Sequence, residues 1–431
     1  MKRITLLLVL ILVFIFASAL IFYPDYDSPR VVKFLIISQI MFALSIAIFI
    51  VGKKFDFEGK HRRLFYLILL LAIAARGVML IGAGEKTYIS DDVYRYVWDG
   101  KVNANGINPY IYTPPDEALE HLQDSVLYPN INHPWLPTIY PPMAQNIFLI
   151  SYTIAGDAIW GFKLLSVLFE LLTIIALLVW LKVMGVRRSN ILLWLYSPLI
   201  LIEFYLSAHT DILAMPFLVA MLLAVKKDHP LLSGIMLALV TLIKFYGLFF
   251  LPFLLMHFKG KNRYKFGLIF SITCVLLYLP YVFGSNGAFL GSLFDYLSDW
   301  QYNASIFFLL KYVFEIEWAR YIVAMIFIVW SGSLLFRKLD IYQKLYRVFG
   351  GYLVLTTTFF PWYFVWIFPF ILRNLSPAFL FLSGSILLSY HVHIGYYSTG
   401  TWSVMPWLGV ISYLPFYLLL IWKTVRDRRR T

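Results

Sequence analysis

Long apolar runs separated by short basic stretches recur along the whole 431-residue chain and leave few folds open to it. Most of these runs have the length of one membrane-spanning helix, about 20 residues. They are residues 4–22, 32–52, 64–84, 158–184, 189–208, 211–225, 265–284, 319–336, 376–391 and 405–422. Two longer runs, 230–258 and 346–372, have Lys or Arg on both sides and predict helical hairpins. The sequence therefore predicts an all-α, polytopic integral membrane protein with about 12–14 transmembrane helices.

The composition excludes a soluble globule, because 61% of the residues are hydrophobic and 14% are charged. The net charge is +13, and 26 of the 36 Lys and Arg fall in the connections that an alternating topology places on one side. By the positive-inside rule that side is cytoplasmic, together with both termini. The charge is thus explained by topology and anionic headgroups, and no nucleic-acid partner is expected.

This topology predicts a multi-pass protein of the inner (plasma) membrane, with a large first extracytoplasmic loop. The polar segment 85–140 forms most of that loop. Pro141 and Pro142 then predict the start of an interfacial helix, since proline favours the first turn. We expect one domain over residues 1–431, in which residues 85–157 provide the extracytoplasmic loop and interfacial helices.

Charged residues gather at the start of this loop. Asp91, Asp92, Arg95 and Asp99 lie within residues 90–100 of a chain that otherwise has little charge. Ionisable groups near a membrane are costly to desolvate and are functional by default. The simpler alternative is a helix N-cap formed by Ser90 or Asp91. One short polar residue suffices for a cap, so the cluster favours catalysis, and both roles are compatible.

Three segments in this order resemble the first extracytoplasmic loop of GT-C fold glycosyltransferases, which use polyprenyl-phosphate sugars. They are Asp91-Asp92-x-Tyr94-Arg95-Tyr96, Gly106-x-Asn108-Pro109-Tyr110 and Tyr140-Pro141-Pro142-Met143. The nearest likeness is to the bacterial mannosyltransferase-like group. The resemblance implies inverting transfer of mannose or another hexose to a hydroxyl of a lipid or glycan acceptor. It also implies an extracytoplasmic active site and no covalent enzyme intermediate.

Transfer of a sugar to a hydroxyl needs a base for the hydroxyl proton. We interpret Asp91 as this base. Asp92 is interpreted as orienting the acceptor or helping to hold a divalent cation, Mg²⁺ or Mn²⁺. A neighbouring carboxylate and partial burial both raise the pKa of an aspartate and make it a stronger base.

The leaving lipid phosphate needs cationic or hydrogen-bonding partners. Lys244, at the tip of the expected 230–258 hairpin, is a candidate together with Tyr246 and Arg95. Two alternatives stay open, because lysine side chains snorkel to the membrane interface and Arg95 is spaced for a local ion pair with a carboxylate of its own helix.

Substrate-binding candidates lie at predicted outer helix ends. His209 and Asp211 could contact sugar hydroxyls, although a helix cap at Thr210 or Asp211 is equally plausible. Aromatic candidates for stacking on a sugar ring are Trp98, Tyr140, Trp362 and Tyr363. Belts of Trp and Tyr occur at such positions without any ligand.

The main rival function is a membrane transporter or flippase for a lipid-linked or anionic substrate. Broken helices and buried Lys and Asp also occur in transporters, but these folds usually contain internal repeats. The sequence contains no such repeat, and a transporter does not require a long first external loop that begins with an acidic pair.

Overall fold

The computed structural model describes residues 2–22, 27–285 and 287–428, and across these ranges the chain is helical without a β-strand. The helices form two compact units. Unit 1 contains Met1–Gly84, Leu177–Leu206 and Phe360–Thr431, and unit 2 contains Glu85–Ala176 and Ser207–Phe359. Neither unit is one continuous stretch of chain, and their joining into a single domain stays a prediction.

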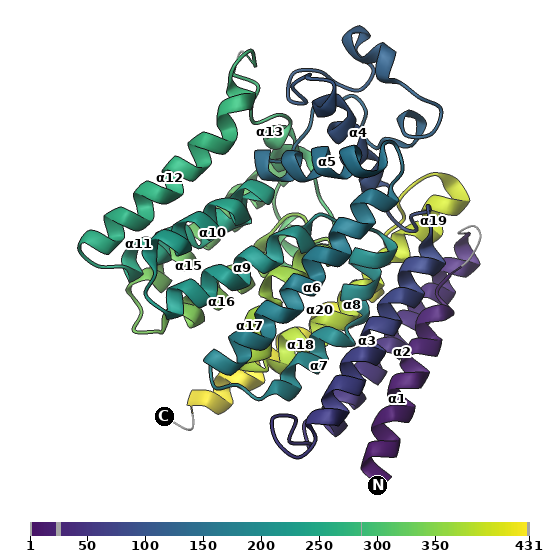
Figure 1. Cartoon of the computed structure of the whole chain (residues 1–431), viewed down its shortest axis with the longest axis vertical. Coiled ribbons are helices and arrows are strands. Elements are labelled where there is room, and N and C mark those ends of the chain that lie inside the picture. Colours follow the sequence, from purple (N-terminus) through teal and green to yellow (C-terminus); the bar gives the residue numbers. More distant parts are fainter. Residues whose placement is uncertain (1, 23–26, 286, 429–431) are drawn as a thin grey trace. The chain divides into compact units, whose positions relative to one another are not determined.

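Unit 1 begins with three long apolar helices, and α1 packs against both α2 and α3 (Figure 1). At the start of α2, the Asp27 carboxylate accepts a hydrogen bond from the Arg30 backbone N–H, which caps the helix. The elements of this unit are α1 (Lys2–Ala19), α2 (Ser28–Gly52), α3 (Arg62–Ala83), η3 (Arg188–Ile191), α7 (Leu192–Leu195), α8 (Pro198–Leu201), η4 (Ile202–Leu206), η6 (Pro361–Ile367), α17 (Phe368–Asn374), α18 (Pro377–Ser385), η7 (Ile386–His391), α19 (Val392–Thr399) and α20 (Pro406–Arg428).

Unit 2 contains the polar loop and the helices that support it, and α10 packs between α9 and α12 (Figure 1). Helix α6 (Trp160–Val183) starts in this unit and ends in unit 1. The other elements are α4 (Asp92–Ala104), η1 (Glu117–Leu122), η2 (Tyr128–Asn130), α5 (Pro142–Ala155), α9 (Asp211–Lys226), α10 (Pro230–Ile243), η5 (Phe245–Phe249), α11 (Leu251–His257), α12 (Lys261–Val282), α13 (Leu293–Asp299), α14 (Ile306–Leu310), α15 (Ile316–Phe336) and α16 (Ile341–Leu355). The expected helix after Pro141 is therefore present as α5.

Among the described residues, eight helices are long and apolar enough to cross a membrane, or nine if a bent pair of helices is counted as one span. The pair is Arg188–Leu195 with Pro198–Leu206, which meet at 49°. This confirms a polytopic membrane protein, but the number is below the 12–14 expected from hydropathy. The difference comes from apolar runs such as 211–225 and 230–258, which fold into helices of 16 residues or fewer.

The run 230–258 reverses direction, as its flanking basic residues predicted. Helix α10 ends at Ile243, and Lys244 has an extended backbone that interrupts the helix before η5 and α11. The two ends of the run return to one place, since residues 228–232 line a surface hollow together with Asn262 and Lys265. Lys244 therefore lies at the tip of a hairpin.

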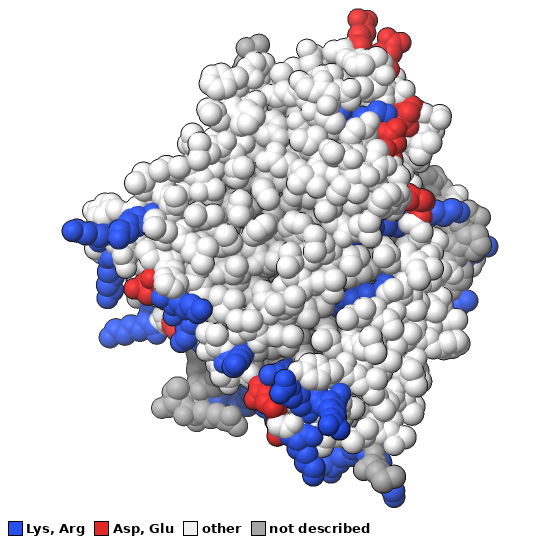
Figure 2. Space-filling view, in the orientation of Figure 1, with Lys and Arg blue, Asp and Glu red and all other residues white. Residues whose placement is uncertain are grey.

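Charges within unit 2 separate along its helices. Helices α9 and α10 are consecutive and packed together, so Asp211 and Lys244 lie at one end and Lys226 and Lys227 at the other. Figure 2 shows Lys and Arg gathered where α12 begins, whereas Asp and Glu gather on the loop that follows α4. This is the pattern that the positive-inside rule describes.

Candidate active site

Helix α4 begins at Asp92, directly after Asp91. Asp91 occupies the N-cap position, but its carboxylate accepts no capping hydrogen bond from the helix backbone. The Ser90 hydroxyl accepts a hydrogen bond from the Asp92 backbone N–H instead, at 3.3 Å. The cap alternative therefore applies to Ser90, and the Asp91 carboxylate serves another partner.

That partner is Asn132, which the sequence did not single out. Its side-chain amide donates one hydrogen bond to Asp91 Oδ1 at 2.9 Å and another to Asp92 Oδ1 at 2.7 Å. Because both N–H groups of one amide are used, the two carboxylates are held in a fixed relation to each other. Asn132 is thus a positioning residue for the acidic pair.

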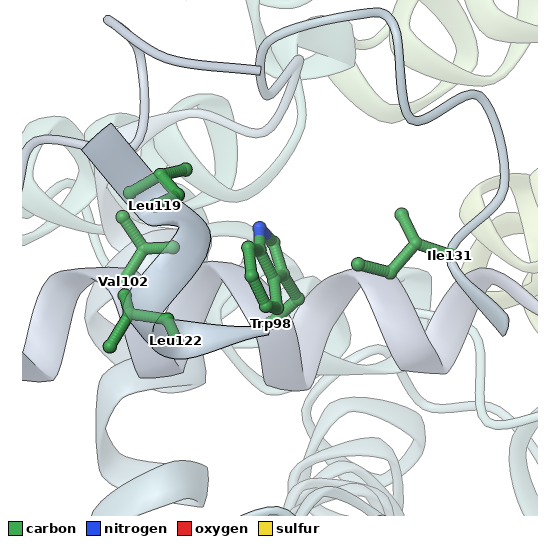
Figure 3. Packing of buried hydrophobic residues seen from close by; sticks show 5 residues of the cluster. All are labelled: Trp98, Val102, Leu119, Leu122 and Ile131. Carbon is green, nitrogen blue, oxygen red and sulfur yellow. The ribbon is translucent and has the colours of Figure 1, made fainter. Parts of the chain in front are cut away.

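A small hydrophobic cluster fixes the chain next to Asn132. Figure 3 shows Trp98 of α4 lying between Ile131 and the short helix η1, which carries Leu119 and Leu122. Trp98 is only 1% exposed, so its indole packs the loop onto α4 and does not reach an open surface for sugar stacking. Since Ile131 belongs to this cluster, the next residue, Asn132, is brought to the start of α4.

Helix α4 is itself held closely against α5. A side chain at Gly100 would collide with the backbone carbonyl of Phe148, so glycine permits this close approach. The Tyr96 ring stacks on Phe148 with centroids 5.0 Å apart. From this position the Tyr96 hydroxyl donates to Asp92 Oδ2 at 3.2 Å. The close packing of the two helices thus places a hydrogen-bond donor on the second Asp92 oxygen.

His209 approaches the same carboxylate from the start of α9. Its Nε2 lies 3.0 Å from the Ser90 hydroxyl and 3.9 Å from Asp92 Oδ2, and the ring is fully buried. The structure therefore brings together the acidic pair and the His209 segment, which are more than a hundred residues apart in sequence.

Burial and, to a smaller extent, the neighbouring Asp91 carboxylate raise the pKa of Asp92 to about 6. The hydrogen bonds from Asn132 and Tyr96 and the positive charge of Lys244 act in the opposite direction. An aspartate with this pKa is a stronger base than an ordinary one and is still largely ionised at neutral pH. Asp92 thus has the character expected of a general base.

Lys244 forms an ion pair within this site. Its ammonium lies 2.7 Å from Asp211 Oδ2 and 5.3 Å from the centre of the Tyr246 ring. The Asp211 side chain is fully buried, whereas 18% of the Lys244 side chain is exposed. The ammonium is therefore held by a buried carboxylate, while part of the Lys244 side chain is accessible.

Arg95 forms a local ion pair with Asp99. Its Nε lies 2.8 Å from Asp99 Oδ1, and its guanidinium also donates to the Leu136 carbonyl at 3.0 Å. Gln145 donates to Asp99 Oδ2 at 3.1 Å, and the Thr138 hydroxyl donates to the same oxygen. The ion-pair alternative for Arg95 is thus the one observed, and it fastens the loop to α4 and α5.

The other aromatic candidates for sugar binding belong to different units of the chain. The Tyr140 ring packs edge-on against Tyr96, at 5.0 Å, and so lies beside the acidic pair. Trp362 and Tyr363 belong to η6 of unit 1, where Trp362 stacks on Phe360 at 4.4 Å. Their role in binding substrate stays a prediction.

A divalent cation bound by the protein alone would need several ligand side chains close together. Among the residues described, no three His, Cys, Asp or Glu side chains are grouped so that they could hold a metal ion. Asp91 and Asp92 alone would need substrate oxygens to complete the coordination of Mg²⁺ or Mn²⁺. Metal dependence therefore stays a prediction, and the chemistry below is assigned to protein side chains.

Residues 87–260 match a family model described as alpha-(1->6)-mannopyranosyltransferase, N-terminal domain. This range includes the unit 2 residues of the site from Asp91 to Tyr246. The match is with a mannosyltransferase family. No curated protein and no solved structure matched the chain. The family match supports a mannosyltransferase-like glycosyltransferase, which implies a sugar donor and an acceptor as substrates.

Proposed function

We propose that this protein is a GT-C type hexosyltransferase that moves mannose from a polyprenyl-phosphate donor to a hydroxyl of a lipid or glycan acceptor. One observation carries the proposal. Within the segment that matches the mannosyltransferase family, Asp92 has a raised pKa and lies under the electrostatic influence of the Lys244 ammonium. A base and a cation for the leaving phosphate are the two groups that this transfer requires.

In the proposed reaction Asp92 takes the proton of the acceptor hydroxyl. The acceptor oxygen forms a bond to the anomeric carbon, and the bond from that carbon to the phosphate oxygen breaks. The electron pair leaves with the lipid phosphate, whose negative charge faces Lys244. Asp91 had been interpreted as the base from sequence. The exposed position of Asp91 and the raised pKa of Asp92 favour Asp92 instead.

Inversion fixes the stereochemistry of the donor. The family description names an α-(1→6) linkage in the product. Because a single displacement inverts the anomeric centre, an α-linked product calls for a β-linked donor. The proposal therefore specifies a β-linked mannosyl phosphate lipid as substrate.

We place the active site on the extracytoplasmic side. The acidic pair, His209 and Lys244 lie at the end of α9 and α10 opposite to Lys226 and Lys227. With 16 residues in α9, these two ends are about 24 Å apart. If the basic end is cytoplasmic, as the positive-inside rule requires, the site faces the other side.

The direct test measures transfer from a radiolabelled polyprenyl-phosphate mannose by the full chain in lipid nanodiscs. Asp92→Asn should lower kcat by about 100-fold or more, because a positioned base contributes that much. Asp228→Asn is the matched control, since Asp228 is exposed and lies between α9 and α10 at their other end. Equal turnover by Asp92→Asn and the native chain would remove Asp92 as the base.

Topology is tested separately by cysteine labelling. In a Cys274→Ser background, a cysteine introduced at Glu117 should react with a membrane-impermeant maleimide from the extracytoplasmic side. Labelling of this cysteine only from the cytoplasmic side would show that the protein has the opposite orientation. The rival transporter function predicts substrate movement without transfer of label to an acceptor, and the family match supports the transferase.

A further inference from the structure

An aromatic cluster lies beside the acidic pair and takes no part in the chemistry described above. His133 and Trp135 come from the loop, and Trp300 comes from the end of α13, more than a hundred residues later. The His133 ring packs edge-on against Trp135 at 5.2 Å and against Trp300 at 4.8 Å. Trp300 in turn contacts Tyr296, with centroids 5.4 Å apart. Two distant segments of unit 2 thus build one aromatic surface.

The position of this surface relative to Asp91 is set by the neighbouring residue. Asn132 is hydrogen-bonded to both carboxylates, so His133 follows directly after the clamp. His133 is close enough to Asp91 that the carboxylate acts on its ring electrostatically. The aromatic surface therefore adjoins the exposed side of the acidic pair.

The cluster is accessible although it is made of large aromatic rings. Trp135 is 65% exposed and His133 is exposed. His133 also has a φ of 44°, a backbone conformation that residues other than glycine adopt at an energetic cost. The preceding residue, Asn132, is hydrogen-bonded to both carboxylates, and the His133 ring packs against Trp135 and Trp300.

Flat aromatic faces next to carboxylates suit a sugar ring, which has an apolar C–H face and an edge of hydroxyl groups. Sites of this kind combine aromatic walls with a few convergent polar groups. We propose that His133, Trp135 and Trp300 form the binding site for a glycosyl residue of the acceptor, next to the Asp91–Asp92 pair. This proposal rests on the proposed function and names the surface on which its acceptor lies.

We assign the aromatic surface to the acceptor and not to the sugar of the donor, because Asp92 has buried groups on one side and exposed groups on the other. Lys244, His209 and Asp211 approach from buried helix ends, and Lys244 is the cation available to a lipid phosphate. Asp91, His133 and Trp135 are exposed. In an in-line displacement the attacking hydroxyl and the leaving phosphate approach the anomeric carbon from opposite sides, so the exposed surface is left for the acceptor.

The test compares Trp135→Ala, Trp300→Ala and the conservative Trp135→Phe with the native full chain in nanodiscs. The first readout is binding of α-1,6-linked mannobiose by saturation-transfer difference NMR, which requires no turnover. The second is the apparent KM for an α-mannoside acceptor and for the lipid donor. Trp422→Ala is the matched control, since Trp422 is also exposed and lies near the end of α20, away from the loop in sequence.

Both alanine variants should weaken mannobiose binding and raise the acceptor KM about tenfold, which is typical for loss of an aromatic anchor, while the donor KM is unchanged. Trp135→Phe should retain most of the affinity. Native affinity for mannobiose in both alanine variants overturns the proposal, and so does a rise in the donor KM alone. A lower thermal stability without a change in sugar binding also overturns it, because the cluster is then a membrane-interface belt.

The outcomes separate this proposal from the proposed function. If the native chain transfers mannose but sugar binding does not depend on Trp135 and Trp300, the proposed function is supported and the aromatic binding site is contradicted. If mannobiose binding depends on both tryptophans but no mannose is transferred from the lipid donor, the aromatic binding site is supported and the proposed function is contradicted.

Discussion

The Lys244 ammonium lies 2.7 Å from the carboxylate of Asp211, a pairing that joins the tip of one hairpin to the start of the preceding helix. Asp211 is fully buried, so the pair is more than an exposed surface contact. In sequence Lys244 had no carboxylate nearby. The connection between α9 and α10 brings the two together, because consecutive antiparallel helices return the chain to the same end.

Replacing Lys244 tests its two roles. Lys244→Ala removes the ammonium from a buried carboxylate and should lower the free energy of unfolding by about 3–5 kcal/mol. Under the proposed function it should also weaken binding of the lipid donor, whereas Lys244→Arg retains the charge and should bind. Thermal melts and donor titration check this. Lys226→Gln is the control, because Lys226 is exposed at the other end of α9. Unchanged donor affinity in a folded Lys244→Ala variant would show that Lys244 does not bind the phosphate.

The raised pKa of Asp92 predicts the acid limb of the pH–rate profile. A protonated carboxyl cannot accept the acceptor's proton, so turnover should fall as the pH is lowered through about 6. Asp91→Asn removes a neighbouring negative charge, which lowers the pKa of Asp92 and moves the limb to lower pH. Asn132→Ala removes a hydrogen bond to the ionised form and moves the limb to higher pH. Shifts in the reverse directions would contradict Asp92 as the titrating group.

The site illustrates what could be predicted from sequence. Ionisable groups are rare in this chain, so those at the ends of apolar helices are conspicuous, although capping and snorkelling were open alternatives. They are Asp91, Asp92, His209, Asp211 and Lys244. Hydropathy and basic flanks then predict which helix ends share a side of the membrane. The structure places these five residues together, as that reasoning anticipated, while their catalytic and binding roles stay predictions.

Asn132 and His133 could not be found in this way. They lie in a loop rich in proline and asparagine, where no periodicity indicates a direction for any side chain. Their positions depend on Ile131 packing against Trp98, a contact between residues 33 positions apart. Trp98 was proposed as a sugar-binding aromatic because it lies at a predicted outer helix end. The same contact with the loop buries its ring and leaves no open face for a sugar.

Arg95 offers a test that separates its ion pair from phosphate binding. Arg95→Lys retains a positive charge but loses the geometry that reaches both Asp99 and the Leu136 carbonyl. We expect it to lower the free energy of unfolding by about 1–3 kcal/mol and to leave the donor KM unchanged. Urea or thermal unfolding together with donor kinetics checks this. A raised donor KM in Arg95→Lys with native stability would instead assign Arg95 to the phosphate.

The packing of Ile131 should govern the catalytic step through Asn132. Ile131→Ala removes a buried side chain from the cluster around Trp98 and should lower the free energy of unfolding by about 2–5 kcal/mol. Because the loop then no longer holds Asn132 on the two carboxylates, kcat per folded molecule should fall and the acid limb should move to higher pH, as in Asn132→Ala. Donor KM should not change.

Phe307→Ala provides the matched comparison. Phe307 is fully buried in a separate cluster of unit 2 with Ala304, Ala319, Val323 and Leu355. Its loss should destabilise the protein by about 3–5 kcal/mol while kcat per folded molecule and the pH profile stay native. An equal fall in kcat for Phe307→Ala and Ile131→Ala would mean that general loosening, and not the position of Asn132, accounts for the effect. A native pH profile in Ile131→Ala would show that the packing of the loop on Trp98 does not position Asn132 at the acidic pair.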